Sequence, residues 1–171
     1  MVIKRWAPFL LMTVSGCYSS LDSGRYQGEI QGERIAVSGS EASFSDTLDM
    51  DISLVSTRGR DRYLMNLCDG FVSFLSDPLC LSDIEAIQDE ADLTAVDEYG
   101  WYADYGSAYC EGTELINING KVEDNLNLTL TLTYTLNLID NAASEDCLTI
   151  MADRTSRASA TGTITLGGSA E

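Results

Sequence analysis

The sequence predicts a mainly β protein: a single antiparallel β-barrel or sandwich of about seven to nine strands, with one short helix near residues 83–92. Three observations lead to this fold class. Residues 126–138 alternate strictly between apolar and polar side chains, further short alternating segments are separated by turn residues, and the chain of 171 residues is long enough for one domain with a core of its own.

The clearest strand covers residues 126–138, where Leu or Tyr occupies every even position and Asn or Thr every odd one. Side chains alternate between the two faces of a strand, so one face is apolar and the other polar. The turn at residues 123–125 joins this strand to residues 113–122 as a hairpin. Residues 155–166 alternate in the same way, and their small residues indicate a crowded or bent strand.

Earlier strands are expected where alternation continues between turn residues. They cover residues 25–30, 34–38, 43–56, 62–68 and 71–75. The dipeptide Asp69-Gly70 suits a tight hairpin turn between the last two.

One helix is expected after these strands. Ser82 and Glu85 are spaced as a capping box, in which each side chain accepts a hydrogen bond from a free backbone amide of the first turn. Ile84, Ile87 and Ala91 would form the apolar stripe of that helix.

The first 16 residues have the pattern of a secretory signal peptide, which is removed from the mature protein. Lys4 and Arg5 form a basic head, residues 6–14 are mostly apolar, and Ser15 and Gly16 are small. The apolar run is well short of the ~20 residues that span a bilayer as a helix.

The end of this leader, Val14-Ser15-Gly16-Cys17, resembles the lipobox of bacterial lipoproteins. The resemblance implies that the sulfur of Cys17 carries a diacylglyceryl group and that the chain is cut before this residue. Residues 17–24 would then be a lipid-anchored tether and residues 25–168 the β domain. Tyr18 stands where Asp signals inner-membrane retention, which favours the outer membrane, on its periplasmic or surface face. The alternative is a secreted protein with a chance cysteine at this position.

Charge limits the possible partners. The chain carries 10 basic and 27 acidic residues, a net charge of −17, and loss of Lys4 and Arg5 with the leader makes it −19. Nucleic acid is therefore repelled, and we expect none as a partner. Residues 83–98 hold seven carboxylates, which suggests either a solvated acidic face or a calcium site. No calcium-loop motif is present, so we favour the acidic face and expect no metal.

Once Cys17 is assigned to lipid, four cysteines remain: Cys68, Cys80, Cys110 and Cys147. An even number in an exported protein indicates two disulfides. Cys110 and Cys147 flank the hairpin of residues 113–138 at the same end, so this pair is expected to be bonded, and Cys68 is expected to pair with Cys80.

The residue types needed for most catalysis are missing. The chain has no His, and Lys121 is the only lysine after the leader. This excludes imidazole-based triads and histidine metal sites, so we expect neither an enzyme nor a bound cofactor. A hydrolase that uses two carboxylates on a glycoside stays as an alternative, because the chain is rich in acids.

The best candidate binding residues lie in the aromatic, glycine-containing segment 99–109. Tyr99, Trp101, Tyr102 and Tyr105, with carboxylates nearby, would suit a sugar ring or an organic cation. The competing interpretation is that these aromatic side chains fill the core or close the end of a barrel.

These observations lead to two binding hypotheses. The first is an envelope lipoprotein, anchored in the membrane by Cys17, whose non-catalytic β domain has a structural role or binds a partner protein or glycan. The second is a carrier of a small apolar ligand, because Gly24-Arg25-Tyr26-Gln27-Gly28 resembles the opening of lipocalin-like barrels. In that case the even-numbered leucines of residues 126–138 would line the ligand cavity.

Overall fold

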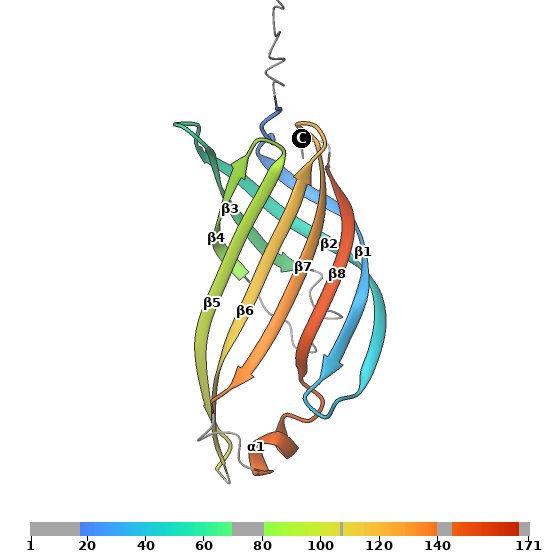
Figure 1. Cartoon of the computed structure of the whole chain (residues 1–171), viewed down its shortest axis with the longest axis vertical. Coiled ribbons are helices and arrows are strands. Elements are labelled where there is room, and N and C mark those ends of the chain that lie inside the picture. Colours follow the sequence, from blue (N-terminus) through green and yellow to red (C-terminus); the bar gives the residue numbers. More distant parts are fainter. Residues whose placement is uncertain (1–17, 70–80, 107, 140–144, 168–171) are drawn as a thin grey trace, which may run out of the picture.

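The computed structural model describes residues 18–69, 81–106, 108–139 and 145–167, which form an eight-stranded antiparallel barrel (Figure 1). The elements are β1 Gly24–Ala36, β2 Glu41–Ser56, β3 Asp61–Asp69, β4 Leu81–Asp89, β5 Asp92–Asp104, β6 Tyr109–Val122, β7 Asn127–Leu138, α1 Glu145–Ile150 and β8 Thr155–Leu166. Each strand pairs with its sequence neighbours, and β1 pairs with β8 to close the barrel. The predicted class, a mainly β antiparallel barrel with one short helix, is confirmed.

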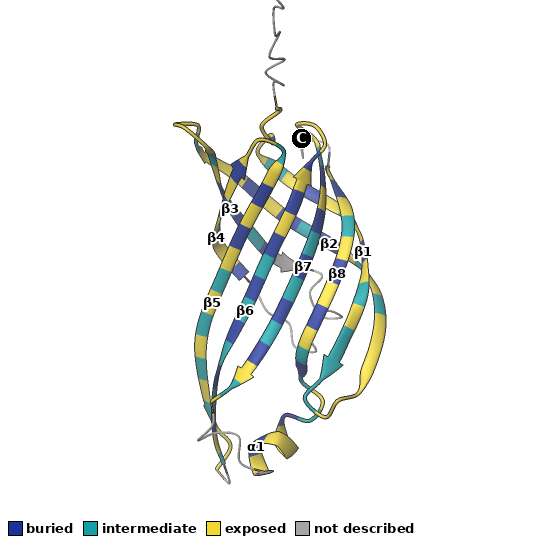
Figure 2. Ribbon diagram, in the orientation of Figure 1, coloured by how far each residue is buried: buried dark blue, intermediate teal, exposed yellow. Residues whose placement is uncertain are grey.

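The core fills the interior of the barrel, and burial alternates along each strand (Figure 2). On β7, Leu128, Leu130 and Leu132 point inward and are at most 1% exposed, whereas Thr129 points outward. Burying a leucine side chain fully contributes about 1.5–3 kcal/mol. The predicted apolar face of residues 126–138 therefore faces inward.

Glycines allow the backbones of β1 and β8 to approach each other closely where the barrel closes. A Cβ atom on Gly32 would lie 2.0 Å from the carbonyl oxygen of Ser159, and one on Gly162 would lie 2.2 Å from that of Glu29. No other residue fits at either position without moving backbone. The prediction that residues 155–166 are crowded is confirmed. Residues 25–30 and 34–36, predicted as parts of two strands, join through residues 31–33 into the single strand β1, and residues 37–38 lie in the turn that follows.

The helix predicted near residues 83–92 is wrong in its position, because these residues form most of β4 and the start of β5. Ile84 and Ile87 are three residues apart, as on a helix, but only Ile84 is buried. Ala86 and Gln88 point inward with Ile84, which is the alternation of a strand. Hydrogen bonding to β3 and β5 outweighs the local helix signal. The short helix lies instead at α1.

Residues that were expected to be a tether are part of the folded domain. Leu21 is 1% exposed. Its amide donates to Tyr63 Oη (3.0 Å), and Gln88 Nε2 donates to the carbonyl oxygen of Ser19 (2.8 Å). An apolar side chain at the mouth of the barrel gains more from burial than from staying in a solvated linker. The expected tether at 17–24 and the domain start at residue 25 are therefore corrected, because residues 19–23 pack onto the barrel.

These contacts define the two ends of the molecule. The amide of Asp22 donates to Asn125 in the turn between β6 and β7 (2.9 Å), so residues 18–22 lie at what we call the proximal end. The turn between β5 and β6 and the helix α1 lie at the opposite end, which we call the distal end (Figure 1).

Candidate functional site

The four predicted binding residues lie toward the distal end, but on two sides of the barrel wall. Tyr99 and Trp101 stand opposite Glu114 and Gly112 of β6 and face inward with them. Tyr102 faces outward and is 73% exposed, and Tyr105 is exposed in the turn that follows. Tyr99 and Trp101 therefore pack inside the barrel, as the core interpretation expects, whereas Tyr102 and Tyr105 are exposed and stay candidates for binding.

The inward residues belong to a polar group that we call the inner cluster: Tyr99, Trp101, Glu114, Tyr134 and Arg154. Glu114 is 2% exposed and accepts hydrogen bonds from the Tyr99 hydroxyl and from Arg154 Nη2 (2.5 Å). The Arg154 guanidinium also lies over the Trp101 ring, 4.9 Å from its centroid. This is the geometry of a cation–π contact.

Burial raises the pKa of both tyrosines of the inner cluster above the ordinary value of 10.0. For Tyr99 the hydrogen bond to Glu114 acts in the same direction, and for Tyr134 the charge of Glu114 does. Both hydroxyls are therefore protonated at neutral pH, and that of Tyr99 donates to Glu114. A hydrogen-bonded ion pair of this kind fixes the strand ends around it, and we assign the inner cluster a structural role.

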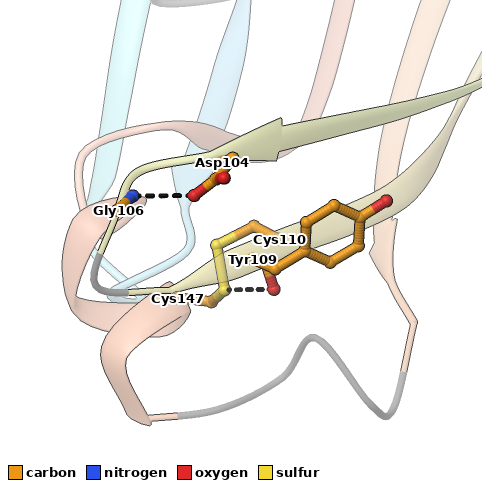
Figure 3. Close-up of a disulfide and its surroundings, with 5 residues drawn as sticks. All are labelled: Asp104, Gly106, Tyr109, Cys110 and Cys147. Atoms are coloured by element: carbon orange, nitrogen blue, oxygen red, sulfur yellow. Dashed lines mark hydrogen bonds between the residues drawn. A yellow bond between two sulfur atoms is a disulfide. The ribbon is translucent and has the colours of Figure 1, made fainter.

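The predicted disulfide between Cys110 and Cys147 is confirmed, with the two Cα atoms 5.8 Å apart (Figure 3). It joins α1 to the start of β6, beside the β5–β6 turn. Cys147 Sγ lies 3.4 Å from the carbonyl oxygen of Tyr109, which is a contact only, because a disulfide sulfur has no proton to donate. The predicted pairing of Cys68 with Cys80 lies outside the described residues and side chains.

The outward side of the same hairpin carries four side chains that we call the outer quartet: Tyr102, Asp104, Tyr109 and Glu111. Tyr102 stands opposite Glu111, and Asp104 stands opposite Tyr109. The tyrosines thus occupy one diagonal and the carboxylates the other. The two tyrosine rings are stacked, with centroids 6.1 Å apart and planes at 23°.

Both tyrosines of the outer quartet are open to solvent, at 73% exposed for Tyr102 and 54% for Tyr109. Asp104 Oδ1 accepts a hydrogen bond from the amide of Gly106 (2.8 Å), which orders the turn (Figure 3). Sequence reasoning did not select Tyr109 as a binding residue. Pairing the residues on either side of the short connection between Asp104 and Tyr109 would have placed Tyr109 diagonally beside Tyr102.

Acidic side chains are neutralised differently at the two ends of the barrel face formed by β3 to β6. Residues 63–120 contain no Lys or Arg, so their carboxylates depend on cations from elsewhere in the chain. Three ion pairs meet this need toward the proximal end: Arg60 with Asp89, Arg62 with Glu85, and Lys121 with Asp92. Within the part of the chain that the structure describes, neither Asp104 nor Glu111 has an ion-pair partner. The predicted acidic face of residues 83–98 is thus partly neutralised by these ion pairs, whereas the two carboxylates of the outer quartet, which lie beyond it, have no such partner among the described residues.

An open depression of about 400 Å³ crosses β7, β8, β1 and β2, where Glu33, Glu41 and Arg157 are among the lining residues. The leucines of β7 that we expected to line a ligand cavity do not line it. Among the residues described, no group of three or more His, Cys, Asp or Glu side chains is arranged to hold a metal ion.

No helix within the described ranges is long and apolar enough to cross a membrane. Comparison with known proteins found no family model, no curated protein and no solved structure that matches this chain.

Proposed function

We propose that this protein is a lipid-anchored envelope protein whose barrel is a non-catalytic binding module, with the outer quartet as its contact surface. One observation carries the proposal. The outer quartet, which has exposed stacked tyrosines and unneutralised carboxylates, lies at the distal end, whereas the residues that follow the predicted lipidation site lie at the proximal end.

The dimensions of the barrel suit presentation away from a membrane. Strand β5 begins at Asp92, near the proximal end, and Tyr102 lies ten residues further along it. At about 3.3 Å per residue, this places Tyr102 roughly 33 Å along the strand from Asp92. Residues 19–22 are hydrogen-bonded to the barrel, so a lipid on Cys17 would hold the proximal end close to the bilayer.

The surroundings of the outer quartet suit recognition. The disulfide and the inner cluster hold the β5–β6 hairpin from its tip and from its inward side. A surface that is rigid before binding loses little conformational entropy when a partner binds, which favours affinity. Asp104 and Glu111 lie on an open strand face, whereas glycoside hydrolysis needs carboxylates on both sides of a bound sugar, so we do not propose the hydrolase.

The anchor is tested by expressing the full chain and its Cys17→Ala variant in a bacterium with metabolic labelling by a fatty acid. The expected result is label in the envelope fraction for the natural chain and loss of the label for the variant. A natural chain that carries no lipid would refute the anchoring half of the proposal.

The contact surface is tested by capturing partners from solubilised envelope with the purified domain and with Tyr102→Ser and Tyr109→Ser variants. Tyr18→Ser is the matched control, because Tyr18 is 54% exposed but lies at the proximal end. We expect the distal variants to lose the captured partner and the control to retain it. Equal capture by all the proteins would remove the outer quartet as the binding surface.

A further inference from the structure

We infer that the outer quartet binds the cationic side chains of a partner protein, namely arginine or lysine in an extended basic segment. This inference rests on the proposed function, because it uses the same surface and names the chemistry of the occupant. Three features of the molecule support it: the arrangement of the quartet, the charge around it and the shape of β5 beside it.

The diagonal arrangement suits an organic cation. A guanidinium or ammonium group placed on the solvent side of the stacked pair would contact the exposed parts of the Tyr102 and Tyr109 rings on one diagonal. The carboxylates of Asp104 and Glu111 would flank it on the other. Aromatic rings attract cations through their electron-rich faces, and carboxylates attract them through charge. A neutral sugar would use only the tyrosines and would leave two carboxylates facing an uncharged ligand.

Charge complementarity points to the same class of occupant. In the described residues the cations nearest in sequence to this wall are already paired: Arg62 with Glu85, Lys121 with Asp92, and Arg154 with Glu114. The quartet therefore keeps its negative charge within a chain whose net charge is −17. A basic partner is attracted to such a surface over a Debye length of about 8 Å at physiological salt, and an acidic or neutral partner is not.

The outward face of β5 extends the site beyond a single cation. Glu98, Gly100, Tyr102 and Asp104 follow one another on this face at every second residue. A Cβ atom on Gly100 would have only one neighbouring atom within 4 Å, at 3.9 Å, so the glycine leaves an open gap between Glu98 and Tyr102. Alternate side chains of an extended peptide have the same spacing as those of a strand. One basic side chain would lie in this gap against Glu98 and the next in the quartet.

The test measures binding of an arginine-containing peptide to the purified domain by isothermal titration calorimetry. Two other probes are compared with it: the same peptide with glutamine in place of arginine, and a neutral chitooligosaccharide. We expect the arginine peptide alone to bind, with an affinity that falls as salt is raised. The double variant Asp104→Asn/Glu111→Gln should weaken binding about tenfold, which corresponds to a loss of about 1.4 kcal/mol.

Two controls separate this inference from the proposed function. Glu29→Gln removes an outward acid from β1, far from β5 around the barrel, and should leave binding unchanged. Because the quartet points into solvent, its variants should keep the melting temperature of the natural domain. If the sugar binds and Tyr102→Ser abolishes that binding while the arginine peptide fails, the inference is overturned and the proposed function stands. If the arginine peptide does not bind, or binds the double variant equally well, the inference is overturned, and the capture experiment decides the proposed function separately.

Discussion

The guanidinium of Arg154 joins two parts of the distal end, because it forms an ion pair with Glu114 of β6 (2.5 Å) and lies over the ring of Trp101 of β5 (4.9 Å). Arg154 comes from the segment between α1 and β8. The Arg154 side chain therefore links the segment between α1 and β8 to strands β5 and β6, whose outward side carries the outer quartet. The two partners differ in solvent contact: the Glu114 side chain is 2% exposed and that of Arg154 is 28% exposed.

This difference in burial predicts an unequal cost when either member of the ion pair is replaced. Arg154→Met leaves a buried carboxylate without its cation and should lower the free energy of unfolding by about 3–5 kcal/mol. Glu114→Gln leaves a guanidinium that can reach water and should cost less, about 1–3 kcal/mol. Urea unfolding of both variants, followed by circular dichroism, measures the two values.

The matched control for Arg154 is Arg157→Met, which removes an exposed arginine from the outward side of β8 and should change stability by less than about 0.5 kcal/mol. The double variant Glu114→Gln/Arg154→Met should be more stable than the sum of the single losses implies, because no charge is left buried. A larger cost for Glu114→Gln than for Arg154→Met would contradict the assignment of Glu114 as the buried partner.

Removing the disulfide should destabilise the barrel. Cys110 and Cys147 are separated by 37 residues, and a loop of this length restricts the unfolded chain by about 4 kcal/mol in the chain-entropy treatment. We expect the Cys110→Ser/Cys147→Ser variant to show a lower unfolding midpoint in urea. It should also lose affinity for any partner that depends on Tyr109, the neighbour of Cys110. Equal stability of the two proteins under oxidising conditions would show that the bond does not form in the natural chain.

The residues that follow the predicted lipidation site should contribute to folding. Leu21→Ala should cost about 2–5 kcal/mol, the range for deleting a buried leucine side chain. Tyr18→Ala, three residues earlier and exposed, is the control and should cost almost nothing. Thermal unfolding of the two variants compares them directly. If Leu21→Ala were as stable as the control, residues 18–22 would be a free linker, as the sequence alone suggested.

Sequence patterns predict the parts of the fold in which apolar and polar residues alternate along a strand without interruption. Residues 126–138 and 155–166 are of this kind, and both are strands in the barrel. The Cys110–Cys147 bond follows from the same hairpin, because its two ends must meet. In these segments local pattern and tertiary pairing favour the same structure.

Sequence patterns failed in the segments where polar side chains face the interior of the barrel. On β5 the inward series contains Asp97 and Tyr99, and on β4 it ends in Gln88, so alternation is hidden there. The inner cluster could not be predicted either, because Glu114 and Arg154 are 40 residues apart and meet only when the barrel closes. The residues next to Glu114 in the sequence do not indicate a partner 40 residues away.

Alkaline pH should unfold the barrel through its inward tyrosines. Burial is the main cause that raises the pKa of Tyr26 to about 12, and it also raises the pKa of Tyr63, Tyr99 and Tyr134 above the ordinary 10.0. Between pH 10 and these higher values the unfolded chain releases protons that the folded chain retains. The stabilisation is therefore complete below pH 10 and is lost as pH rises through the folded pKa values.

Urea unfolding midpoints measured at increasing pH should fall above pH 10, together with a rise in tyrosinate absorbance as the buried hydroxyls ionise on unfolding. Tyr26→Phe removes one of the titrating groups, and with it the hydrogen bond from its hydroxyl to the carbonyl oxygen of Asp22 (2.7 Å). This variant should be less stable at neutral pH but should lose stability less steeply in alkali. If Tyr26, Tyr63, Tyr99 and Tyr134 ionised near pH 10 while the circular dichroism of the barrel stayed unchanged, the inward positions of these four would be wrong.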